Sequence, residues 1–497
     1  MMEKHTEIFE QYSKGTAYKN SIGLFETVKQ NENFFVGRQW ERVQANGLPT
    51  PVFNFIQRVV MFLISSTMSD SVAMTASAID EGETKDGGEC AEAINLEFAK
   101  VFERCDILSK LRLFLRNAAV DGDGCLYLRY DPDSSKSGGI EAEIIDNTRV
   151  FFGNPNECEV ERQPYIIISS YEYIDDLKRM IIRNGGSGEE ANRLEGGGQA
   201  DPLGAERAVL LLRLRKDPLT GHVMACEATE NLVIREEWDT GLTRYPIIWM
   251  NWERVKDCCH GQAAVSGLIP NQIFVNKLFA MAMISMMSTA YPKVVYDSTR
   301  IASWDNRVGT AVPVAGGDVS GVAAIINPAQ ISPQVHEFID SAISYTRDFM
   351  GATDASLGLV RADNTSAILA LQRASQVPLE LVRQELFQRV EDMGHIIIDI
   401  CAAYLGKRSV KGKMFDFSRL HELPFVIRLD VGASSYWSEV AAMQSLDNLM
   451  NRGLISLKDY LERVPAGMIP RKEELIEAMA AAVPGGAGLD AAGFGGL

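Results

Sequence analysis

The longest apolar stretch of the chain lies at residues 268–293, LIPNQIFVNKLFAMAMISMMSTAYPK. Pro270 suits a first helical turn, and Pro292 ends the helix because the residue before a proline avoids helical backbone angles. Residues 278–291 carry no charge and include four methionines. This run is shorter than the ~18 residues that a membrane span needs. A helix that is apolar on nearly all sides requires cover, so we predict a core helix or a helix covered by further copies of the chain.

Hydrophobic periodicity predicts the elements that precede this helix. Polar helices are expected within residues 3–33, an apolar helix containing Arg58 at 54–66, and one long amphipathic helix at 87–119. Short alternating runs between residues 140 and 252 predict mainly antiparallel strands, with a helix at 174–182. The glycine-rich segment 184–204 predicts a flexible surface loop.

A second series of elements follows the apolar helix. Residues 294–328 predict a compact β-rich insert with strands at VVYD (294–297) and AVPVAG (311–316), and residues 334–350 predict a helix. Residues 351–367 interrupt the helical pattern with glycines and polar side chains, and a helix at 366–405 is expected to kink at Pro378. The predicted C-terminal elements are strands at 415–417 and 424–431, helices at 436–452, 456–464 and 470–483, and a loose glycine-rich tail.

Composition indicates a globular α+β protein with more than one packed unit, because 497 residues with 46% hydrophobic content exceed one ordinary core. The net charge of −17 argues against a protein that holds nucleic acid through a basic face, although nucleic acid could still pass without being bound.

The N-terminus has no apolar segment typical of a signal peptide, so none is expected. The eight cysteines include no CxxC pair, and we interpret them as reduced thiols packed as small hydrophobes.

Motifs for catalysis or metal binding are weak. Cys258-Cys259-His260 lacks a second ligand pair at zinc spacing, and the acidic loop 121–124 lacks the further ligands of a calcium loop, so we predict a helix-to-strand turn there. His395, on an apolar helical face, is interpreted as a core histidine. The sequence contains no HExxH, GxSxG or P-loop motif. We therefore expect no enzyme, cofactor or metal site. The alternatives are a soluble enzyme with an unrecognised site and a membrane-associated protein that inserts residues 268–291.

The order of these elements resembles the portal (head-to-tail connector) proteins of tailed bacteriophages. Four segments carry the resemblance, which extends over nearly the whole chain: NFFVGRQW (33–40), GLPTPVFNFIQRVV (47–60), GLIPNQIFVNKLFAMAMISMMSTAYPKVVYD (267–297) and DNTSAILALQRASQVPLELVRQELFQRVEDMG (363–394). It implies a portal-protein fold with an α/β wing, a helical stem, a small β-rich clip, a long kinked helix and a short helical crown. The implied parts are the wing (1–260 and 407–435), the stem helices (261–292 and 331–350), the clip (293–330), the tunnel loop (351–365), the long kinked helix (366–406), the crown helices (436–484) and a flexible tail (485–497).

The resemblance also implies a function. Portal proteins form a ring, usually of twelve subunits, at one capsid vertex of the virion, and are assembled in the host cytoplasm. The ring is the channel for DNA packaging and ejection and the attachment point for the packaging motor and tail. The implied partners are further copies of the chain, double-stranded DNA without sequence readout, terminase, a head-completion or tail adaptor protein, and a major capsid or scaffolding protein, with no membrane.

Three sets of site residues follow from the resemblance. The DNA-facing tunnel loop would use Asp354, Ser356, Arg361 and Asn364, clip docking would use Arg300, Trp304 and Arg307, and stem packing would use Phe274, Leu278, Met281 and Met286. A plain interhelical loop is the alternative for 351–364, and simple packing of the insert is the alternative for Trp304. A net acidic chain suits a conduit, because a basic bore would bind DNA and slow it.

Overall fold

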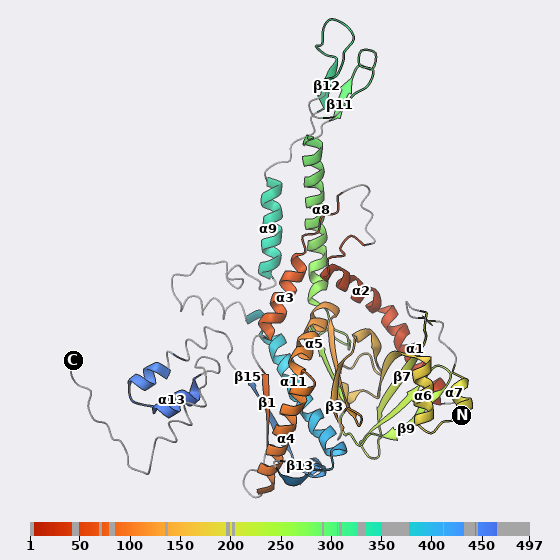
Figure 1. Cartoon of the computed structure of the whole chain (residues 1–497), viewed down its shortest axis with the longest axis vertical. Coiled ribbons are helices and arrows are strands. Elements are labelled where there is room, and N and C mark those ends of the chain that lie inside the picture. Colours follow the sequence, from red (N-terminus) through yellow and green to blue (C-terminus); the bar gives the residue numbers. More distant parts are fainter. Residues whose placement is uncertain are drawn as a thin grey trace, which may run out of the picture. The chain divides into compact units, whose positions relative to one another are not determined.

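The computed structural model (Figure 1) divides the chain into two compact units, Met1–Met68 with Met74–Leu429, and Ser69–Ala73 with Asp430–Leu497. The structure describes residues 4–41, 49–68, 72–78, 85–134, 138–194, 199–200, 204–290, 293–305, 307, 311–326, 334–349, 377–410, 412–431, 443 and 446–464. The coarse expectation of a mixed helix and sheet protein is confirmed.

The N-terminal helices of the first unit follow the predicted pattern. Helix α1 (Lys4–Ser21) and helix α2 (Leu24–Phe35) are separated at Gly23, whose φ of 69° lies in the left-handed region that glycine adopts without strain. Helix α3 (Phe55–Thr67) begins after Asn54, whose side chain accepts a hydrogen bond from the backbone N–H of Gln57.

The single long helix predicted at 87–119 is wrong. The chain forms helix α4 (Lys85–Arg104) and helix α5 (Ile107–Asp121), separated by Asp106 with a left-handed φ of 47°. Val101, Cys105 and Ile107 are buried on both sides of the break. The apolar repeat therefore continues across a change of direction that periodicity alone cannot detect.

Two antiparallel sheets form the predicted strand region. The six-stranded sheet has the order β4 (Val150–Phe152), β5 (Tyr165–Tyr173), β7 (Glu206–Lys216), β8 (Val223–Ala228) and β9 (Val233–Asp239), and β6 (Gln199–Ala200) also pairs with β7. The three-stranded sheet has the order β10 (Ile247–Asn251), β2 (Asp123–Asp131) and β3 (Gly139–Ile144). Short 3-10 turns, η1 (Asn147–Arg149) and η2 (Val160–Arg162), flank β4.

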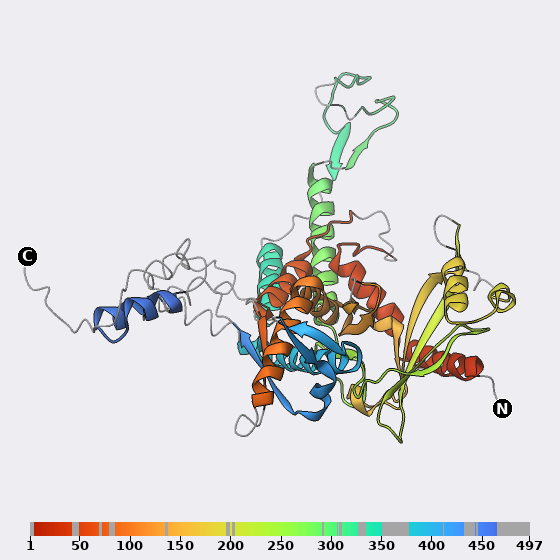
Figure 2. The ribbon, with the colours of Figure 1, turned by 60° about the horizontal axis from the view of Figure 1, so that its bottom comes forward.

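Helices cover both faces of the six-stranded sheet. Ile8 of α1 packs with Ile167 and Leu211 on one face, and the red α1 lies beside the yellow-green strands in Figure 2. Leu210 of β7 points to the opposite face, because successive strand residues alternate. There it packs with helix α6 (Ile174–Arg183) and with Ala191 of helix α7 (Gly188–Asn192). The prediction of a flexible loop over 184–204 is wrong at α7, which Ser187 and Glu190 stabilise with a capping box.

The apolar stretch forms helix α8 (Ala264–Ala290), and helix α9 (Gln334–Phe349) packs against it. The prediction that Pro270 opens this helix is wrong, because the helix begins at Ala264 and its extra turn is held by the buried Val265 and Leu268. The insert between the two helices contains one antiparallel pair, β11 (Lys293–Tyr296) and β12 (Ala323–Ile326). The strand predicted at residues 311–316 is absent, and these residues form irregular structure.

The remaining elements end the first unit and begin the second. Pro378 lies in the 3-10 turn η3 (Val377–Leu379), directly before helix α11 (Glu380–Tyr404). The strand pairs are β13 (Lys407–Val410) with β14 (Lys413–Asp416), and β15 (Phe425–Val431) with β1 (Val72–Ala78), and η4 (Phe417–Glu422) follows β14. In the second unit, helix α13 (Leu457–Arg463) begins with a capping box at Ser456. The tunnel loop, residues 366–376 of the long helix and the helix expected at 470–483 lie outside the described residues.

Candidate functional site: the exposed half of helix α8

Among the described residues, the buried side chains of helix α8 all lie between Ala264 and Ala280. Helices α2, α3 and α5 pack against it. Its buried residues are Ala264, Val265, Leu268, Ile269, Gln272, Val275, Asn276 and Ala280. No residue after Ala280 is buried, so the apolar end of the helix emerges from the core.

A chain of buried amide side chains fixes the base of the helix. Gln272 donates to Asn276 (3.0 Å), Asn276 donates to Gln39 (2.7 Å), and Gln39 donates to Asn54 at the start of α3 (3.0 Å). Gln272 also donates to the carbonyl of Phe53 (2.9 Å). Buried amides are costly unless they are bonded, so this chain specifies one position of α8 against α3. We did not predict this role, although two amides four residues apart on an apolar helix would have indicated it.

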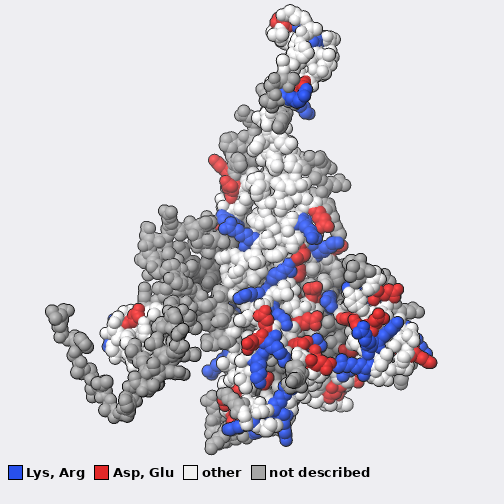
Figure 3. Space-filling view, in the orientation of Figure 1, with Lys and Arg blue, Asp and Glu red and all other residues white. Residues whose placement is uncertain are grey.

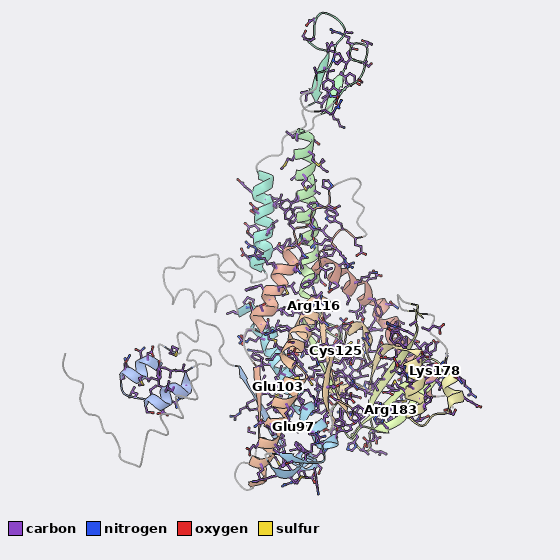
Figure 4. All side chains as sticks on the ribbon, in the orientation of Figure 1. Glu97, Glu103, Arg116, Cys125, Lys178 and Arg183 are labelled. Carbon is purple, nitrogen blue, oxygen red and sulfur yellow. The ribbon has the colours of Figure 1, made fainter. Side chains whose placement is uncertain are left out.

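Further polar contacts join α8 to α2 and α5. The buried Asn31 donates to the carbonyl of Val120 and to the hydroxyl of Ser266, both at 2.9 Å. Arg116 of α5, labelled in Figure 4, donates to both carboxylate oxygens of Glu32 at 2.7 and 2.6 Å. This paired contact fixes the orientation of α5 against α2, and both of these helices pack on α8.

The second half of α8 presents a charge-free apolar surface. Met281 is 54% exposed, Met286 is 68% exposed, and Met283 and Met287 are also exposed. The atoms of this part of α8 appear white in Figure 3, which marks the absence of Lys, Arg, Asp and Glu. Exposed apolar groups of this number in one element indicate an interaction surface.

The predicted stem residues lie along the middle and the second half of α8. Phe274 is 43% exposed and its ring contacts Phe338 of α9 edge-on, with the ring centroids 5.8 Å apart. Leu278 is half-buried, and Met281 and Met286 are exposed. All four side chains lie on α8, and none of them is fully covered within one copy of the chain. Their role in subunit packing stays a prediction.

The length of α8 changes the comparison with a membrane span. The helix has 27 residues and is long and apolar enough to cross a membrane by length and composition. The uncharged run of residues 278–291 alone is shorter than a membrane span. The difference arises because Lys277 interrupts the uncharged run but not the helix. The first half of α8 nevertheless buries Gln272 and Asn276 in bonded protein contacts, which are the contacts of a core helix.

The predicted docking residues have different surroundings within the insert. The ring of Trp304 stacks on Tyr296 with centroids 5.7 Å apart, and Arg300 donates to the carbonyls of Ala315 and Asp318. These two side chains therefore hold the insert together. Arg307 forms an ion pair with Asp305 (2.6 Å), and its side chain is 83% exposed. The tunnel-loop residues Asp354, Ser356, Arg361 and Asn364 lie outside the described residues.

The acidic turn 121–124 organises a second polar cluster. It is a helix-to-strand turn, as predicted, with Gly122 at a φ of 100°. Asp123 is fully buried, accepts hydrogen bonds from Asn251 and the backbone of Gly261 (both 2.7 Å), and contacts His260 (2.7 Å). These bonds fix the segment that leads into α8. Within the described part of the chain, no group of three His, Cys, Asp or Glu residues could hold a metal ion.

Two buried groups have strongly shifted pKa values. Burial lowers the pKa of Lys19 to about 7, and this ammonium group donates to the carbonyls of Asn147 and Val150, both at 2.6 Å. Burial raises the pKa of Asp121 to about 7, against the opposing effect of Arg116. Lys19 is fully enclosed by the core, so the shift accompanies a structural contact rather than access to a substrate.

Comparison with known proteins agrees with this architecture. Residues 216–410 match the family model described as phage P22-like portal protein. The matched segment includes α8, the insert, α9 and α11. No curated protein sequence matches the chain. The match confirms the resemblance to phage portal proteins.

Proposed function

We propose that copies of this chain form a ring at one capsid vertex of a phage, around a channel for DNA packaging and ejection. The observation that carries the proposal is the exposed, charge-free half of α8. In a cyclic ring each subunit gives one face and receives another, so neighbouring copies can cover a helix on two sides. Methionine side chains suit such contacts, because they adapt to imperfect surfaces.

The implied parts of a portal protein are then assigned to the observed elements. In this proposal α8 and α9 are the stem, the insert with β11 and β12 is the clip, and the two antiparallel sheets with their covering helices form the wing. Residues 351–365 line the channel, α11 belongs to the long helix, and residues 436–484 form the crown. Twelve copies, as is usual for portal proteins, would complete the ring.

The same assignment proposes partners for each part. Terminase and a head-completion or tail adaptor protein bind the clip, where the exposed Arg307 is available for an acidic partner surface. The wing contacts the major capsid or scaffolding protein. DNA passes without sequence readout, and the net charge of −17 supports passage rather than tight binding.

The experiment compares wild type with a double glutamate variant in α8 and with a single glutamate control variant. The assembly state of each is measured by mass photometry and negative-stain imaging. In Met281→Glu/Met286→Glu, charges in the proposed interface lose their hydration on assembly, so this variant is expected to remain monomeric while wild type forms rings. Leu219→Glu is the matched control, because Leu219 is 93% exposed on the β7–β8 turn, away from α8. It is expected to form rings like wild type.

Two outcomes would contradict the proposal. A wild-type chain that stays monomeric at every concentration and salt condition would exclude ring formation. Rings that form equally well in the double variant would exclude α8 as the interface. Recovery of the wild-type chain with lipid vesicles rather than as a particle in solution would instead favour membrane insertion of α8.

A further inference from the structure

Two segments about a hundred residues apart meet where the chain leads into α8, one carrying Cys158 and the other carrying Cys258 and Cys259. The thiol of Cys158 donates to the carbonyl oxygen of Cys258 at 2.9 Å, and the backbone N–H of Cys259 donates to the carbonyl of Pro155 at 2.8 Å. The loop between β4 and η2 thus lies directly on the segment between β10 and α8. Cys259 is buried, whereas Cys158 and Cys258 are both partly exposed.

The side chain of Cys258 has room to reach its neighbour. The Cys258 thiol forms a 3.4 Å hydrogen bond with the hydroxyl of Tyr18, a weak interaction for a thiol. The Cys158 sulfur lies against the backbone carbonyl of Cys258, and rotation of the Cys258 side chain about its Cα–Cβ bond would turn the second sulfur toward it. A disulfide also requires Cβ atoms about 3.5–4.5 Å apart, which the backbone of the two loops must supply.

We propose that Cys158 and Cys258 are an oxidation site that forms an intramolecular disulfide and clamps the β4–η2 loop to the base of α8. Cys258 belongs to the Cys258-Cys259-His260 sequence, which lacks a second ligand pair at zinc spacing, and the chemistry does not depend on ring formation. The setting favours it, because disulfides persist outside the cell and are rare in a reducing cytosol. A particle released from its host makes that transition.

The reaction with an azo oxidant such as diamide balances as follows. The sulfur of Cys158 adds to one nitrogen of the N=N bond, and the other nitrogen takes up a proton. The sulfur of Cys258 then attacks the sulfur of Cys158, so that the S–S bond forms and the S–N bond breaks. The departing hydrazine takes the second proton. Two thiols are oxidised and one azo group is reduced.

The test counts alkylatable thiols after diamide treatment, denaturation and removal of excess oxidant. Untreated protein has eight free thiols. Treated wild type is expected to show two fewer and to give a Cys158–Cys258 linked peptide by non-reducing mass spectrometry. Cys158→Ser and Cys258→Ser are each expected to lose none. Cys90→Ser is the matched control, because Cys90 is fully buried in α4, and it is expected to lose two like wild type.

Four results would overturn the proposal. Wild type could retain all its thiols, or the linked peptide could join Cys259 in place of Cys258, or Cys158→Ser could still lose two. An intermolecular disulfide, seen as a dimer on a non-reducing gel, would also contradict it. The peptide map of wild type decides the matter even if a serine variant fails to fold.

Discussion

At the residue scale, the described core contains polar side chains whose partners are distant in sequence. Asp123 and His260, and Asn276 and Gln39, form contacts of 2.7 Å. Each group is costly to bury without its partner, so these contacts act as positional constraints on α8 and the segment before it. Sequence analysis identified Asp123 only as part of a turn, because nothing local in the chain indicates a partner more than a hundred residues away.

Asp121 provides a residue-scale prediction about pH. Its pKa is about 7 in the folded chain, raised mainly by burial, against an ordinary value of 3.8. The folded state therefore binds more protons than the unfolded state between about pH 4 and 7, and this group lowers stability as the pH rises through that window. Asp121→Asn is expected to remove this contribution, so that it is more stable than wild type at pH 8 but not at pH 4.

The measurement is the urea midpoint of both proteins between pH 4 and 8. The difference in midpoint is expected to grow with pH and to level off above about pH 7. Glu189→Gln is a suitable control, because Glu189 lies exposed on α7. Parallel profiles for Asp121→Asn and wild type would show that the carboxyl group is not protonated in the folded chain.

At the element scale, strongly periodic segments were predictable and their interruptions were not. Helices α3, α6 and α9 lie close to their predicted ranges, and strands β7 to β10 fall within residues 140–252, where antiparallel strands were predicted. The break at Asp106 was missed, because aspartate enters the left-handed region too rarely to signal it from sequence. The start of α8 was predicted too late, at Pro270. A proline normally marks a helix start, but the tertiary packing of α8 tolerates this one inside the helix.

The conformation of Asp106 gives an element-scale prediction. Asp106→Gly is expected to be as stable as wild type or slightly more stable, since glycine adopts a positive φ without strain. Asp106→Val is expected to lose about 1–2 kcal/mol, because a branched Cβ is disfavoured in the left-handed region. Chemical denaturation of the two variants measures the difference. Equal stability of both would mean that α4 and α5 join without a left-handed residue.

At the scale of the whole molecule, the match over residues 216–410 supports a portal protein, and the exposed half of α8 supplies a physical reason for assembly. Association through a surface without charges does not depend on ion pairs, so screening by salt weakens it little. The Debye length falls from about 10 Å at 0.1 M salt to about 3 Å at 1 M, which weakens ion pairs but not apolar burial.

Salt dependence is therefore the prediction at this scale. Rings formed by wild type are expected to persist from 0.1 to 1 M sodium chloride, with the same mass distribution by mass photometry. Dissociation at 1 M would mean that ion pairs, rather than the apolar half of α8, hold the subunits together. A DNA-retention assay on the same samples is expected to show weak binding that falls further as salt rises.

The sequence by itself determined the α+β class, the order of most elements, the need of α8 for cover and the portal resemblance. The first three depend on local periodicity and composition, which one chain displays directly, whereas the resemblance depends on the quoted segments and the order of the elements. Only the tertiary structure decided which half of α8 is buried, since a helix that is apolar on all sides has no periodic signal for its covered part. It also decided the partners of Gln272, Asp123 and Cys158, because each contact joins residues that are distant in the chain and become neighbours only after packing.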